Sequence, residues 1–167
     1  FRQHRDLQLN LDGPGADFVI VHGENGEGKT NLLNGILWCF YGNEGSSADV
    51  GNKSNSLVNR AVQDELNLGD TVAVRVTVNL EFSEGLLARV ERSQLFQIGA
   101  KSVKPQGQSE LSIVASTDSA AADASSVPNP EAWLDERFPE RLRQYFLFDG
   151  EELDNFFSAP GANRTVE

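Results

Sequence analysis

The chain has 167 residues, of which 39% are hydrophobic and 23% are charged, a balance that is ordinary for a folded domain with its own core. This composition excludes a wholly disordered chain, a collagen and a coiled coil, and no apolar run approaches the roughly 18–20 residues that would span a bilayer. The formal net charge of −11 argues against a strong binder of nucleic-acid backbones, because such a protein usually presents a basic face.

The cysteine count and the first residues bear on the cellular compartment. Cys39 is the single cysteine of the chain, so an internal disulfide is impossible, which suits a reducing environment. Residues 1–10 lack the apolar core that a signal peptide needs. We therefore expect a cytoplasmic protein.

Two short strands are expected before residue 22. Leucines alternate with polar residues over residues 7–11, which is typical of a half-buried strand. Residues 13–15 read Gly-Pro-Gly and predict a turn. The continuous apolar run over residues 18–21 predicts a strand that is covered on both faces.

A helix is expected over residues 29–41, and Gly42 predicts its end. Apolar side chains recur at intervals of three and four, which places them on one face of this helix: Leu33, Ile36, Leu37 and Phe40. Trp38, Cys39 and Tyr41 lie on or beside this face, and we interpret them as core residues. Residues 43–57 are rich in Gly, Ser and Asn and predict a loop.

A β-rich segment is expected over residues 71–115. Apolar residues alternate without interruption over residues 72–82, which gives the clearest strand of the chain. Residues 83–85 predict a turn, and residues 87–95 predict a strand that returns antiparallel. Residues 111–115 predict a third strand.

The last third of the chain is expected to alternate between solvated and ordered segments. Residues 116–129 have low complexity and predict a solvated linker. Residues 130–138 predict a short helix with Trp133 and Phe138 facing inward, and the carboxylates within residues 131–140 are interpreted as its solvated face.

A final apolar segment ends the predicted fold. Residues 145–148 predict a buried strand that leads into Asp149 and Gly150. Residues 151–157 can open another helix. The last ten residues have the composition of a frayed end.

The strongest motif is a phosphate-binding loop at residues 23–30, which match G-x-x-x-x-G-K-S/T in full: Gly23, Glu24, Asn25, Gly26, Glu27, Gly28, Lys29 and Thr30. Glycines allow backbone N–H groups to curl around phosphate oxygens. The helix that follows presents its amides and its positive dipole end to the anion. Lys29 would reach the β- and γ-phosphates and the Thr30 hydroxyl would ligate Mg²⁺.

The motif order resembles a known family. FRQHRD, a strand, GENGEGKTNLLNGILWCFYG, a β-hairpin and RQYFLFDGEEL are together similar to the N-terminal lobe of an SMC-like ABC ATPase head. The resemblance is closest to the DndD-type ATPases of DNA phosphorothioation and phage defence, and RecF, RecN and SMC proteins are more distant. It covers nearly the whole chain and implies an α/β P-loop NTPase lobe with a mixed sheet and an antiparallel β-hairpin subdomain.

The resemblance also implies a domain organisation. Residues 1–157 would form the N-terminal lobe of the head, with the P-loop, the β-rich subdomain and the linker as bounded above. Residues 145–152 would form a segment like the Q-loop. Residues 151–167 would begin a coiled coil or form the frayed end.

Further site residues follow from the resemblance. Asn25 would meet the γ-phosphate, and Asn31 would lie at the α-phosphate edge. Arg2 matches the basic residue that such heads bring near the nucleotide; a solvated charge at a strand end is the alternative. His4 receives no role and is interpreted as an exposed polar residue.

Asp149 has three open interpretations. Four apolar residues followed by Asp fit a Walker B strand, whose carboxylate holds Mg²⁺. In ABC ATPases, however, Glu follows that Asp directly, whereas here Gly150 intervenes. The family places this FDGE segment at the Q-loop, from which Asp149 would sense Mg²⁺ or the attacking water. A turn Asp that bonds its own backbone is the third interpretation, and Glu151 is a weaker candidate.

The chain lacks an LSGG-like signature and a switch histidine. In heads of this type, these elements, the Walker B strand and its catalytic Glu lie in a C-terminal lobe beyond a coiled coil. The resemblance therefore implies half of a composite site with no catalytic residue of its own, completed by a second head across the bound ATP.

We therefore expect an ATPase that needs Mg²⁺ and that is active only in the complete dimeric head. The expected partners are the C-terminal lobe of the same protein, a second head, DNA, and a nuclease or another defence or repair subunit, with no membrane. The expected role couples ATP binding and head dimerisation to DNA processing, DNA modification or anti-phage defence. The alternatives are a P-loop kinase of small molecules or nucleosides, and a nucleotide-gated interaction module that does not hydrolyse ATP.

Overall fold

A four-stranded antiparallel sheet is the largest element of the molecule. The computed structural model describes residues 1–11, 21–43, 57–100, 102–117 and 123–143. The strands lie in sequence order across the sheet, as β1 Thr71–Glu81, β2 Leu87–Ile98, β3 Val103–Ser116 and β4 Ser125–Ser126. The predicted antiparallel hairpin and third strand are confirmed, and the second and third strands are longer than the periodicity indicated.

Strands β1 and β2 form a regular hairpin, in agreement with the alternation of apolar and polar residues in the sequence. Strands β1 and β2 pair over their whole lengths, from Thr71 opposite Gln97 to Glu81 opposite Leu87. Gly85 closes the turn with a φ of 80°, and its N–H donates to Phe82 O at 2.8 Å. Since side chains alternate between the two faces of a strand, the valines of β1 all lie on one face, and that face meets a helix.

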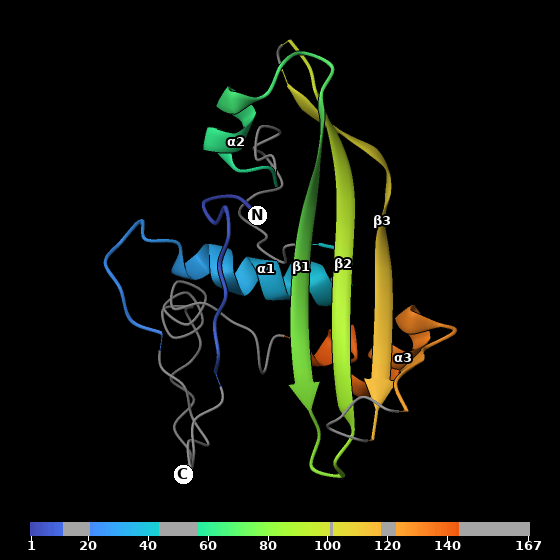
Figure 1. The fold of residues 1–167 in the computed structure, drawn as a ribbon. Coiled ribbons are helices and arrows are strands. Elements are labelled where there is room, and N and C mark those ends of the chain that lie inside the picture. Colours follow the sequence, from blue (N-terminus) through green and yellow to red (C-terminus); the bar gives the residue numbers. More distant parts are fainter. Residues whose placement is uncertain (12–20, 44–56, 101, 118–122, 144–167) are drawn as a thin grey trace, which may run out of the picture.

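The helices cover one face of the sheet and its two ends. They are α1 Lys29–Tyr41, α2 Arg60–Glu65, α3 Pro130–Arg137 and a short 3-10 turn, Glu140–Leu142. Helix α1 crosses the sheet, whereas α2 and α3 lie toward opposite ends of the strands (Figure 1). Among the described residues, no helix has the length and apolar character to cross a membrane.

The bounds of α1 and α3 agree with the sequence. Gly42 ends α1 with a φ of 72° and donates its N–H to Trp38 O at 2.9 Å. Asn129 caps α3, because its side chain accepts from the Ala132 N–H. Helix α2 was not predicted, although Asn59 caps it in the same way: six residues are too few for a periodic signal.

The core forms where the C-terminal half of α1 packs on the sheet. One cluster of buried residues joins α1, the strands and α3: Cys39, Phe40, Ala88, Val90, Ile113 and Leu134. A second cluster lies beside it: Trp38, Val58, Val74 and Phe96. Cys39 is fully buried, and this burial raises the pKa of its thiol to about 12.

A buried arginine joins α1 to the sheet. Arg92 on β2 is 7% exposed. Its Nε donates to Cys39 O at 2.9 Å and its Nη2 to Phe40 O at 3.3 Å, while Nη1 donates to Ser109 Oγ at 3.0 Å. The last carbonyls of a helix have no partner within the helix, so the guanidinium satisfies two of them and carries positive charge to the negative end of the helix dipole.

The strand prediction for residues 7–11 is wrong. These residues form no strand, and Leu7, Leu9 and Leu11 are all 45–49% exposed. Alternation shows only that a segment could line a sheet face; a strand also needs a neighbour with which to pair, and none of the described residues pairs with this segment. Val21, at the end of the second predicted strand, is likewise outside any strand and half exposed.

The predicted linker over residues 116–129 is partly wrong, because residues 123–129 are ordered against the sheet. Strand β4 pairs with β3 through Val114 opposite Ser126. The Asp123 carboxylate accepts hydrogen bonds from the Ser116 hydroxyl and from Thr117 Oγ1. In this part of the segment, the small and polar residues therefore form hydrogen bonds at the edge of the sheet.

Some predictions fall outside the described residues. These are the turn at 13–15, most of the strand at 18–21, most of the loop at 43–57, the strand at 145–148 and the C-terminal segment. Every strand pair within the described ranges is antiparallel, so the expected mixed sheet stays a prediction.

Replacing Arg92 should reduce stability markedly. Arg92→Met keeps much of the side-chain length but leaves two buried helix carbonyls without their donors, and we expect a loss of about 3 kcal/mol in the free energy of unfolding. Urea denaturation followed by circular dichroism measures it. Arg89→Met, an exposed arginine on the same strand, is the matched control and should cost less than about 1 kcal/mol. Equal losses in the two variants would contradict the role given to Arg92.

Candidate functional site

The candidate site is the glycine-rich loop that enters α1. Gly26 and Gly28 have φ values of 90° and 95°, which lie in the left-handed region that residues with a Cβ rarely adopt. Gly28 is the N-cap of α1; no side chain caps this helix end, and its first turn contains no acidic residue. The first N–H groups of a helix lack partners within it, so this end offers donors and a positive dipole end to an anion.

Lys29 folds back over the loop. Its Nζ donates to Gly23 O and to Glu24 O, both at 2.7 Å. Both acceptors are neutral carbonyls, so these contacts do not cancel the charge of the amine. The arrangement holds the ammonium group against the loop's own backbone, where it can meet an anion bound there.

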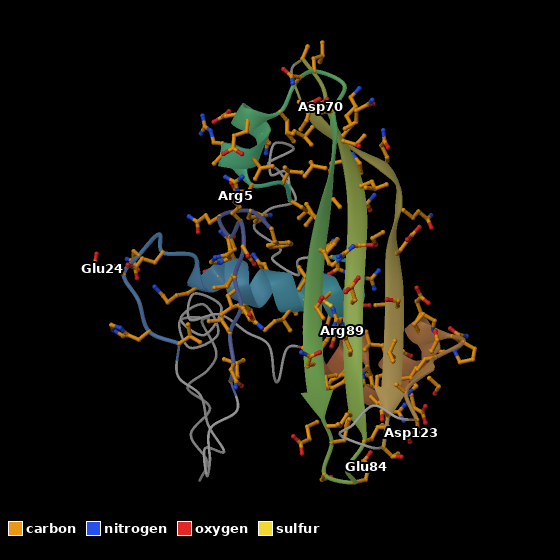
Figure 2. The ribbon with its side chains drawn as sticks, in the orientation of Figure 1. Arg5, Glu24, Asp70, Glu84, Arg89 and Asp123 are labelled. Carbon is orange, nitrogen blue, oxygen red and sulfur yellow. The ribbon has the colours of Figure 1, made fainter. Side chains whose placement is uncertain are left out.

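A carboxylate braces the outer turn of the loop. The Glu24 N–H donates to Glu27 Oε2 at 2.7 Å, and the Glu27 N–H donates to Glu24 O at 3.4 Å. Asn25 is exposed between them. Figure 2 shows Glu24 at the outer end of the loop, away from the sheet. Glu27 therefore shapes the loop through its side chain.

The N-terminal segment contacts the loop through Gln3 and His4, to which the sequence analysis gave no role. Gln3 Nε2 donates to Gly26 O at 3.0 Å, and Gln3 Oε1 accepts from Asn31 Nδ2 at 2.9 Å. His4 Nε2 lies 3.3 Å from Gly28 O. The interpretation of His4 as an exposed polar residue is wrong: the side chain is half-buried because it packs on the loop.

The remaining predicted site residues are placed as follows. Thr30 is exposed on the first turn of α1, beside the uncapped helix end. Arg2 belongs to the same N-terminal segment, where its N–H donates to Leu57 O at 2.7 Å. Asp149 and Glu151 lie outside the described residues, so their roles stay predictions.

The residues present fit a magnesium ion only in combination with a phosphate ligand. Within the described ranges, no group of three or more His, Cys, Asp or Glu side chains gathers to hold a metal. Mg²⁺ prefers oxygen ligands and commonly takes them from substrate phosphates and a few protein groups. The exposed Thr30 hydroxyl is such a group.

A family model described as an AAA domain matches residues 1–160. No curated protein and no solved structure matches the chain.

Two glycine substitutions should distinguish the stability cost of backbone strain from the cost of a clash with the N-terminal segment. Gly26→Ala and Gly28→Ala impose similar strain, because both positions have φ near 90°. A Cβ at Gly26 would meet nothing within 4 Å, whereas a Cβ at Gly28 would lie 2.7 Å from Gln3 Oε1 and 3.0 Å from His4 Cε1. We expect Gly26→Ala to cost about 1 kcal/mol and Gly28→Ala to cost about 1 kcal/mol more. Thermal denaturation measures both, and a smaller loss for Gly28→Ala would contradict the contact.

Proposed function

The chain belongs to the AAA domain family, a family of SMC- and RecF-like ATPases whose model matches residues 1–160, and we propose that residues 23–30 are its ATP-binding loop. Membership gives the coarse function, a nucleotide-binding ATPase domain of the SMC-like head type.

One observation supports the assignment of the loop above all others. Lys29 Nζ lies 2.7 Å from two loop carbonyls, and Lys29 is the first residue of α1, whose N-terminus has no side-chain cap. The glycine-rich loop and the helix start therefore provide an ammonium group together with amides that have no partner within the helix. Charge-assisted hydrogen bonds from such donors are the interactions that hold phosphate oxygens.

The proposed roles rest on the sequence motif for Lys29 and Thr30, and on the family resemblance for Asn25 and Asn31. Lys29 binds the β- and γ-phosphates, and the amides that follow Gly28 hold the phosphate oxygens. Thr30 ligates Mg²⁺, and the ion supplies neutralisation of the phosphate charge when it is bound. Asn25 meets the γ-phosphate from the loop tip, and Asn31 lies at the α-phosphate edge.

Arg2 and Asp149 would complete the nucleotide site. Arg2 lies in the segment that contacts the loop, which is compatible with a basic group near the nucleotide. Asp149 acts from a Q-loop-like segment or a Walker B strand, and it would approach the metal in either case. Its segment, residues 145–152, lies outside the described ranges.

We further propose that the chain is one half of a composite ATPase site. The loop provides positioning and charge stabilisation, but the sequence contains no signature motif and no Asp-Glu pair after a buried strand. A C-terminal lobe and a second head would supply these groups across the ATP. Coupling to DNA processing, DNA modification or phage defence, as in DndD-type ATPases, rests on the sequence resemblance.

Replacing Lys29 should abolish tight ATP binding. Lys29→Ala removes the charged donor to the β- and γ-phosphates, and we expect the Kd for ATP with Mg²⁺ to rise by about 100-fold or more. Isothermal titration calorimetry measures the Kd. Lys104→Ala, which changes an exposed lysine on β3, is the matched control and should bind like the parent.

The control excludes a general effect of lost charge. Circular dichroism before each titration verifies that both variants are folded. Equal Kd values for Lys29→Ala and the parent protein would refute the assignment of the loop.

ATP hydrolysis should depend on the meeting of two heads. We expect the 167-residue chain to release phosphate negligibly, and the protein with its C-terminal lobe to turn over ATP at a rate that rises more steeply than linearly with protein concentration. Phosphate release across a dilution series measures both. Robust turnover by the chain alone, linear in its concentration, would refute the half-site proposal.

A further inference from the structure

The first five residues form a strap across the candidate site. The strap, Phe1–Arg5, contacts the glycine-rich loop with the side chains of Gln3 and His4. It also contacts α1, α2 and the segment that precedes α2. The strap therefore joins the loop to parts of the fold that are distant in sequence.

The ends of the strap are anchored away from the loop. Arg5 forms a two-pronged ion pair with Glu65 of α2, with Nη1 and Nη2 at 2.7 and 2.8 Å from the two carboxylate oxygens. Figure 2 shows Arg5 beside α2. At the other end, the rings of Phe1 and Trp38 lie 5.8 Å apart, centroid to centroid.

The middle of the strap holds the loop itself. The Gln3 amide spans two points, because it donates to Gly26 O at 3.0 Å and accepts from Asn31 Nδ2 at 2.9 Å. One point lies in the outer turn of the loop and the other on the first turn of α1. A single side chain therefore fixes the distance between the loop tip and the helix end that would hold the phosphates.

We propose that Gln3 is a positioning residue for nucleotide binding, which holds the loop in its curled form before the nucleotide arrives. This inference rests on the proposed function of residues 23–30. Gly26 and Gly28 give the loop access to many backbone conformations, and fixing one of them in advance lowers the entropy lost on binding. Gln3 supplies that fixation through hydrogen bonds and need not touch the nucleotide.

The same contacts imply a reciprocal effect. If the strap stabilises the nucleotide-binding form of the loop, then bound nucleotide must stabilise the strap on the loop by the same free energy. The Arg5–Glu65 ion pair carries this stabilisation to α2. Residues 57–66 lie outside the glycine-rich loop. Nucleotide binding should therefore slow their hydrogen exchange through the strap.

Gln3→Met tests the proposal, because methionine has similar length and lacks both hydrogen bonds. We expect the Kd for ATP with Mg²⁺ to rise about 10-fold, because binding must then supply the free energy that orders the loop. Hydrogen–deuterium exchange of residues 23–31 should be faster than in the parent without nucleotide, while the Tm and the exchange of β1 and β2 stay unchanged. Gln8→Met, an exposed glutamine outside the strap, is the matched control.

The exchange measurement without nucleotide separates this proposal from the proposed function. If Lys29→Ala binds ATP like the parent, the ATP-binding assignment fails, and the strap is still judged by the exchange of residues 23–31. If Lys29→Ala loses binding but Gln3→Met keeps the parent's Kd and exchange, the role of Gln3 is refuted. A fall in Tm with uniformly faster exchange would also refute it, because Gln3 would then support only the general fold.

Discussion

The packing of the C-terminal half of α1 on the sheet is the constraint on which the rest of the structure depends. Cys39 and Phe40 are buried against β2 and β3, and Arg92 bonds the last carbonyls of the helix from within the core. A helix of 13 residues is a stiff rod of roughly 20 Å. Fixing one end of it therefore fixes where the other end points, and that other end opens at the glycine-rich loop.

The strap helps to order the glycine-rich loop, which the core packing does not stabilise. The loop is largely exposed, so apolar packing contributes little to its shape. Its order comes from hydrogen bonds instead: Lys29 to two carbonyls, Glu27 to the Glu24 amide, and Gln3 to Gly26 and Asn31. Such bonds are individually modest, which suits a segment that must accept and release a ligand.

An anion site in a chain with a net charge of −11 is not a contradiction. Charges beyond about 8–10 Å are largely screened at physiological ionic strength, so a bound phosphate responds mainly to groups beside it. The favourable groups are the Lys29 ammonium and the amides at the start of α1, and they must outweigh the carboxylates of Glu24 and Glu27 in the loop itself. The carboxylates of α3, which are exposed as predicted, lie on another element, at the far end of the sheet from α2 (Figure 1).

The sequence predicted the parts of the fold that carry a local periodic signal. Helix α1 has its predicted bounds, and β1 follows its alternating valines, because burial of one face both creates the pattern and stabilises the element. The glycine-rich loop was found for a related reason, since its chemistry requires fixed residue types at fixed spacing. Neither inference required knowledge of the tertiary contacts of these residues.

The failures share the opposite property. Leucines at 7, 9 and 11 have the right pattern but no strand beside them among the described residues, and Gln3 and His4 have no pattern at all. Their place on the loop depends on how a five-residue segment is anchored by Glu65 and Trp38, more than 30 residues away. Tertiary structure sets contacts of this kind, and a single sequence without related sequences for comparison carries no signal for them.

The burial of Cys39 has a practical consequence for the study of this molecule in solution. The thiolate is the reactive form of cysteine, and with a pKa of about 12 this thiol stays protonated and enclosed at neutral pH. It is also the single cysteine of the chain. A cysteine introduced at an exposed position such as Asn25 would thus be the one site open to a fluorophore or spin label, and the natural residue could remain where the core needs it.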